Sequence, residues 1–193
     1  MNTTRKVLLS ALVVGAIGSV VALGAFSAFS STTSNAGNTF TAGTVNISDN
    51  DGGATALYQL TNQKPGVTTD RCIKVTYTGS LDSNVKLYSS AIAGAGAGFV
   101  NLTVTPGTQG GAPAFPSCTG FVADAGAPLY NGTAGGFPTS YATGITDNPG
   151  TVATKWATGD SVVYRFSTSV QDTNAAQGAT TGTHSFTWEA QNQ

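Results

Sequence analysis

Residues 161–170, with the sequence SVVYRFSTSV, decide the fold class of this chain. From Val162 to Val170, every second side chain is apolar, aromatic or threonine, and most of the positions between are serine or arginine. Because successive side chains of a β-strand point to opposite faces, this alternation predicts a strand with one face buried. Residues 183–190 show the same two-residue period and predict a second strand of this kind.

Four further segments extend this pattern over the chain. Residues 71–78, 84–88 and 99–105 alternate in the same way, and residues 39–47 do so with an interruption at Ala42-Gly43. After residue 28, no segment keeps the 3.6-residue period of an amphipathic helix. We therefore expect an all-β fold, with two antiparallel sheets packed as a sandwich.

A long insertion separates the strand ending at residue 105 from the next clear strand. Residues 106–149 are rich in Gly, Ala and Pro, with scattered aromatic residues. Structureless loops of this length are rare in compact domains, so we expect short strands near Phe121 and near Leu129-Tyr130. The Ala/Gly run at 91–98 is expected to be a loop, since its repeated glycines disfavour a helix.

The two cysteines, Cys72 and Cys118, predict a disulfide. An even number of cysteines in an exported chain favours pairing, and the alternative is two unrelated buried thiols. The bond would join the strand at 71–78 to the long insertion. The chain-entropy model gives a closed loop of this length a stabilising effect of about 4 kcal/mol.

The N-terminus has the pattern of an export signal. Arg5 and Lys6 precede an apolar run without charge from Val7 to Ala25, and small residues follow. We expect residues 1–28 to form a signal helix that is cleaved after Ala28 or, as the second choice, after Ala25. The alternative is an uncleaved helix that stays in the membrane, since the run approaches the length needed to span a bilayer.

The composition indicates an extracellular β-rich protein. Only 9% of the residues are charged, well below the usual quarter or so in soluble domains. Eight basic residues, two of them in the signal, against nine acidic ones leave the mature chain with a net charge of about −3. The mature chain therefore lacks the basic patch that nucleic-acid binding requires, and we expect no nucleic-acid partner.

Two motifs at the start of the mature chain carry a resemblance to a known family. Ala28-Phe29-Ser30 and the run NTFTAGTVNI at 38–47 resemble the N-terminus of the TasA/camelysin family of secreted bacterial proteins. Weaker similarity continues at 64–66, 78–81 and 156–189. The resemblance implies a jelly-roll-like topology, a dedicated signal peptidase of the SipW type as a partner during export, and a location outside the cell.

The function that the resemblance implies is assembly into extracellular, biofilm-matrix fibres. Subunits of such fibres are thought to donate an N-terminal strand to a neighbour, which makes this chain a homopolymer. Here the donor would be the extension at 29–39, ahead of a domain at 40–193, with Phe29, Thr33 and Phe40 as anchors. The alternative is a tail without structure left by signal cleavage.

Two other function classes remain as alternatives. Camelysins have been described as cell-surface metalloproteases, and the third hypothesis is a monomeric adhesion module that binds through residues 106–149. A catalytic zinc site commonly uses two or three histidines, but His184 is the only histidine and the chain has no His-Glu-x-x-His motif. A Ser-His-Asp triad would also need His184, and no Gly-x-Ser-x-Gly motif accompanies it. We therefore expect no enzyme, no cofactor and no metal, with His184 as a half-buried strand residue. A loop calcium at Asp49–Gly52 is the alternative to an ordinary turn there.

Overall fold

The computed structural model describes residues 39, 41–112, 114–149 and 155–192. The chain divides into two compact units, 1–41 and 42–193. Only Thr39 and Thr41 of the first unit are described, so the fold reported below is that of the second. None of the helices in these ranges is long and apolar enough to cross a membrane. The expected signal segment, 1–28, lies outside them.

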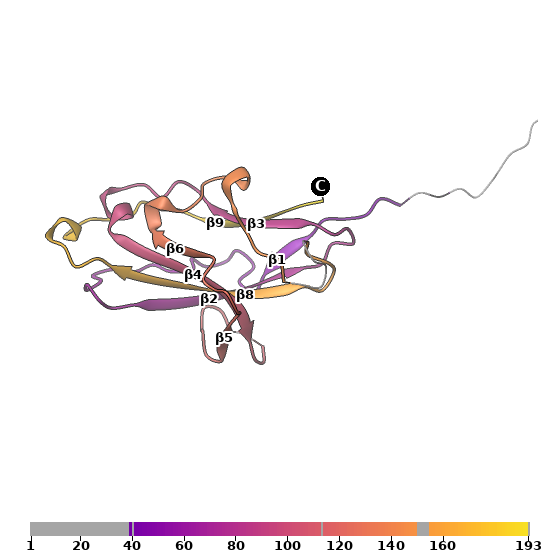
Figure 1. Cartoon of the computed structure of the whole chain (residues 1–193), viewed down its shortest axis with the longest axis horizontal. Helices are drawn as coiled ribbons and strands as arrows, with labels where there is room; N and C mark the ends of the chain where they lie inside the picture. The colour runs from indigo at the N-terminus through magenta and orange to yellow at the C-terminus, as the bar shows by residue number, and fades with distance from the viewer. Residues whose placement is uncertain (1–38, 40, 113, 150–154, 193) are drawn as a thin grey trace, which may run out of the picture. The chain divides into compact units, whose positions relative to one another are not determined.

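The second unit is built from two antiparallel sheets (Figure 1). The larger sheet has the order β1-β2-β8-β4-β5, and β6 also pairs with β4. Its strands are β1 (Ile47–Asp49), β2 (Thr69–Tyr77), β8 (Ser161–Val170), β4 (Val100–Gln109), β5 (Phe121–Ala123) and β6 (Tyr130–Thr133). The smaller sheet has the order β7-β3-β9, with β7 (Ile145–Thr146), β3 (Asn84–Ser89) and β9 (Phe186–Gln191).

The described helices are four short 3₁₀ turns. They are η1 (Ala95–Gly98), η2 (Ala134–Gly136), η3 (Tyr141–Thr143) and η4 (Asn174–Ala176). The chain passes from one sheet to the other five times: between β2 and β3, β3 and β4, β6 and β7, β7 and β8, and β8 and β9. These crossings give a jelly-roll-like sandwich, and the expected all-β class is confirmed.

Strand β8 lies at the centre of the larger sheet, between β2 and β4. The alternation of its sequence places Tyr164 and Phe166 in the core, where each is at most 1% exposed. Phe166 packs on Phe186 of the smaller sheet with ring centroids 4.6 Å apart. Burying an aromatic side chain of this size contributes about 1.5–3 kcal/mol to folding, so this contact between the sheets is a main source of stability.

Strand β4 is longer than expected, because it continues through Pro106 to Gln109. On one side β4 pairs with β8, and on the other it pairs with β6 up to Val104 and with β5 from Gly107. Pro106 lies at the change from β6 to β5, where its carbonyl accepts from Asp124 N–H at 3.0 Å. The N–H that proline lacks would point toward this junction and not toward β8, so Pro106 removes no hydrogen bond between β4 and a neighbouring strand.

The expected strand at 39–47 is mostly wrong. Of the described residues in this segment only Ile47 belongs to a strand, and the apolar Val45 is 39% exposed. In contrast, the short strands expected near Phe121 and Tyr130 are present as β5 and β6. The Cys72–Cys118 disulfide is also present, with Cα atoms 5.1 Å apart.

Candidate functional site

The chain enters the sandwich beside the continuation of β2. The carbonyl oxygen of Asn46 accepts from Thr78 and Gly79 N–H (2.9 and 3.2 Å), and that of Thr44 accepts from the N–H groups of residues 80 and 81 (2.9 and 3.1 Å). A Cβ on Gly79 would meet the Tyr77 hydroxyl at 2.3 Å, so only glycine fits at this close approach. The two short motifs at 44–47 and 78–81, far apart in sequence, are therefore direct partners.

An open strand edge lies in the smaller sheet. Among the described residues, β9 pairs only with β3, so its other side has no strand partner. Ser90 N–H donates to the Ser185 carbonyl at 2.9 Å, which sets the hydrogen-bonding phase of the β3–β9 ladder. In an antiparallel pair this phase alternates, so the N–H groups of Phe186, Trp188 and Ala190 point toward the open side. Figure 1 shows β9 at the margin of its sheet.

A groove of about 230 Å³ lies along this edge. It is the seam between the two sheets, because one wall comes from β1 and the other from β9. Its lining residues are Ile47, Ser48, Asp49, Val75, Phe186, Thr187 and Trp188. Its lining is mixed, with polar side chains such as Asp49 beside apolar ones such as Phe186 and Trp188. A groove beside unpaired backbone groups is what an added strand uses, since the backbone gives affinity and the pockets give side-chain specificity.

His184 lies just before β9 and is held by two hydrogen bonds. Its Nδ1 lies 2.9 Å from the Gly182 carbonyl, so Nδ1 carries the proton and donates. Its Nε2, 3.1 Å from the Tyr58 hydroxyl, then accepts from it. Burial raises the pKa of Tyr58 to about 12, which keeps this hydroxyl protonated as a donor. His184 is half-buried against Tyr58 and Phe186, in a structural environment.

The residues around His184 do not fit a zinc site. Both ring nitrogens already have partners, and within the part of the chain that the structure describes no three His, Cys, Asp or Glu side chains are grouped closely enough to hold a metal ion. Residues 49–52, for which a calcium loop was the alternative to an ordinary turn, form a turn. Asp49 Oδ1 accepts from Asp51 and Gly52 N–H (3.0 and 2.6 Å), and Asp51 Oδ1 accepts from the Thr55 hydroxyl at 2.8 Å.

A polar cluster of Asp147, Tyr164 and Trp188 lies between the sheets. The Tyr164 hydroxyl interacts with the Asp147 carboxyl and with the Trp188 indole, although Asp147 Oδ2 and Trp188 Nε1 are buried without a hydrogen bond of ordinary geometry. Trp156 Nε1 donates to the Asp147 carbonyl at 2.6 Å. Burial raises the pKa of the Asp147 carboxyl, and the Asp124 charge adds to this, while the bond to Tyr164 opposes it.

The raised pKa of Asp147 predicts a pH-dependent stability. Between the usual Asp value and the raised one, the folded chain holds a proton that the unfolded chain has lost, so stability falls as the pH rises through this window. We expect Asp147→Asn to raise the free energy of unfolding at neutral pH by about 1 kcal/mol and to flatten its pH dependence. Urea unfolding from pH 4 to pH 8 measures both. An equal loss of stability at every pH would contradict the assignment.

The remaining residues expected to form sites fall into two groups. Cys72 and Cys118 are brought together as expected. Phe29, Thr33 and Phe40, the expected donor-strand anchors, lie outside the described residues, as does the extension at 29–38. The sequence reasoning missed the groove between β1 and β9. The apolar alternation of residues 186–190 marked the inward face of β9 but not which side of the strand stays unpaired.

Comparison with known proteins agrees with the motifs. Residues 3–93 match the family model described as Camelysin metallo-endopeptidase. The match covers just under half of the chain and includes β1, β2 and β3. It confirms the resemblance to the TasA/camelysin family inferred from residues 28–30 and 38–47. No curated protein matches the chain.

Proposed function

We propose that this chain, whose residues 3–93 match the camelysin family model, is a secreted structural protein whose copies join end to end into extracellular fibres. The observation that carries the proposal is the open β9 edge beside a groove of mixed polar and apolar lining. An unpaired edge of this kind is a template for another strand. The low charge of the chain, with only 9% charged residues, favours close association of copies.

The proposed occupant of the edge is the N-terminal extension, 29–39, of a second copy. The extension has eleven residues, more than the six of β9, so it is long enough to pair along the whole edge. In an extended donor Phe29 and Thr33 face one side and Phe40 faces the other. Phe29 and Thr33 therefore enter the groove together, while Phe40 stays with its own domain. Donation from each copy to the next does not close into a ring, so it produces filaments.

A proline at the β9 edge tests the acceptor. Ala190→Pro removes an N–H that points to the open side and costs no bond to β3, so the sandwich is expected to fold. Electron microscopy of the mature protein at rising concentration should show filaments for the wild type and at least tenfold fewer for Ala190→Pro. Ala190→Ser, which keeps the N–H, is the matched control and should polymerise normally. Equal filament formation by Ala190→Pro would exclude β9 as the acceptor.

The family description favours one second candidate, a surface metallo-endopeptidase. The described residues do not fit a zinc site, as the two occupied nitrogens of His184 show. Cleavage of casein by the purified mature protein, lost with a chelator, restored by zinc and abolished in His184→Ala, would favour the protease over the structural protein. The proposed location is the cell surface or extracellular matrix, the location associated with this family, and the proposed membrane contact is limited to the signal segment at 1–28.

A further inference from the structure

The other long edge on this side of the sandwich belongs to β2. Strand β1 covers only Val75–Tyr77, so residues 69–74 of β2 extend beyond it. Cys72 N–H donates to the Pro116 carbonyl at 3.0 Å and Lys74 N–H donates to Asn50 Oδ1 at 2.9 Å, so both point away from β8. By the same alternation Asp70 N–H also faces outward. Residues 70–74 would therefore be an acceptor edge if these groups were open.

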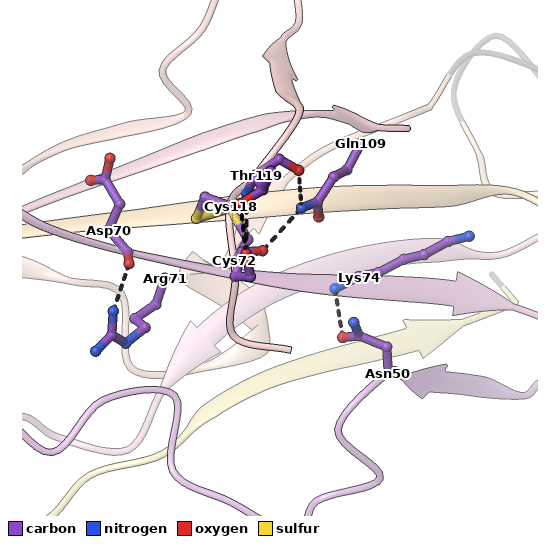
Figure 2. Close-up of a disulfide and its surroundings, with 9 residues drawn as sticks. Asn50, Asp70, Arg71, Cys72, Lys74, Gln109, Cys118 and Thr119 are labelled. Atoms are coloured by element: carbon purple, nitrogen blue, oxygen red, sulfur yellow. Dashed lines mark hydrogen bonds between the residues drawn. A yellow bond between two sulfur atoms is a disulfide. The ribbon is translucent and has the colours of Figure 1, made fainter. Parts of the chain in front are cut away.

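The N–H groups of Cys72 and Lys74 are instead occupied by partners that are not strands (Figure 2). Asn50 takes both groups of Lys74, because its Oδ1 accepts from Lys74 N–H and its own N–H donates to the Lys74 carbonyl at 3.0 Å. Arg71 Nη1 donates to the Asp70 carbonyl at 3.1 Å. Pro116 supplies the partner of Cys72 N–H. Backbone groups that are already bonded in this way cannot pair with another strand.

The segment that brings Pro116 to this edge is residues 114–120, which we call the strap. It leads into β5, which pairs with β4, and it reaches β2, so it crosses the outer face of β8, which lies between β4 and β2. Three bonds hold it there: the Cys72–Cys118 disulfide, and two bonds from Gln109 Nε2 to the carbonyls of Ser117 and Thr119 (3.0 and 2.7 Å). Val163 on the outer face of β8 is consequently only 4% exposed.

We propose that the strap is an edge guard, which blocks β2 and so leaves β9 as the acceptor edge. Without the disulfide, Pro116 leaves Cys72, and the outward backbone groups at residues 70–72 become a second acceptor for a copy of the same chain, while Asn50 still occupies Lys74. A protein with two acceptor edges branches or clumps, while a protein with one grows as a single filament. The choice of β9 rests on the proposed function, but the blocking of β2 rests only on the contacts at that edge.

The experiment uses the mature protein and its variant Cys72→Ser/Cys118→Ser. Amide hydrogen exchange at position 72 should be about tenfold faster in the variant, because one hydrogen bond is lost. Size-exclusion chromatography should show new oligomers. Adding Asp70→Pro, which removes the outward N–H and no bond to β8, should abolish them. Asp70→Ala, which keeps that N–H, is the matched control and should leave them unchanged.

A second variant keeps the test valid if the first fails to fold. Gln109→Leu releases the two carbonyls of the strap but leaves the disulfide, and should speed exchange at Cys72 without new thiols. Unchanged exchange at residues 70–74 and no new oligomers in either variant would overturn the guard. If the strap variants form oligomers through β2 but the wild type forms no filaments, the edge guard is supported and the proposed fibre is contradicted. Filaments of the wild type, together with no effect of either strap variant, would support the proposed fibre and contradict the edge guard.

Discussion

Deletion of residues 29–37 from the mature chain is expected to leave a folded monomer that no longer forms filaments. Among the described residues, backbone pairing begins at Thr44, whose carbonyl accepts from the N–H groups of residues 80 and 81, and the deletion leaves Thr44 and all later residues in place. It removes the proposed donor and leaves the β9 edge and its groove without an occupant. Negative-stain microscopy at rising concentration, with circular dichroism to verify the fold, measures the result.

A synthetic peptide of residues 29–39 provides the control for this deletion. Added in excess to the truncated protein, it should bind β9 and slow amide exchange at Phe186, Trp188 and Ala190, the positions whose N–H groups point outward. A peptide with Phe29 and Thr33 replaced by aspartate should not, because each new carboxylate would lose water against Phe186 and Trp188 and would be repelled by Asp49 in the same groove. Filaments of unchanged abundance and thickness after the deletion would eliminate strand donation and leave the sandwich intact.

Loss of the Cys72–Cys118 disulfide is expected to lower the free energy of unfolding by about 4 kcal/mol, the chain-entropy value for a loop of this length. The bond joins residues 46 positions apart, so without it the unfolded chain gains many conformations. For a domain of this size the melting temperature should fall by about 8–16 °C. Thermal and urea unfolding of Cys72→Ser/Cys118→Ser against the oxidised wild type measure the change.

The wild type treated with a thiol reductant is the matched control for these substitutions. It should lose nearly the same stability, because the chain entropy depends on the cross-link and not on the side chains that replace it. A variant that is destabilised while the reduced wild type is not would assign the effect to repacking at Cys72, which is only 2% exposed. Two alkylatable cysteines in the folded exported protein would contradict the bond itself.

The sequence alone determined the strands whose faces differ most. The two-residue period of 161–170 matches β8 over its full length, and residues 71–78 and 84–88 match β2 and β3 within two residues. These strands could be predicted because alternation is a local property: one face meets the core whichever strand lies beside it. The pairing of Cys72 with Cys118 was equally accessible, since only two cysteines exist.

The tertiary structure decided everything that depends on neighbours. Pro106 ends a strand by local rules, yet β4 continues because its missing N–H falls at the change from β6 to β5. The pattern of 39–47 predicted a strand, yet Thr44 and Asn46 each give one carbonyl to two N–H groups. Which edge stays open is the clearest case: β2 and β9 alternate equally well. Asn50 and Pro116, which are distant from β2 in sequence, occupy the β2 edge, while the β9 edge stays without a strand partner among the described residues. No local sequence pattern encodes such contacts.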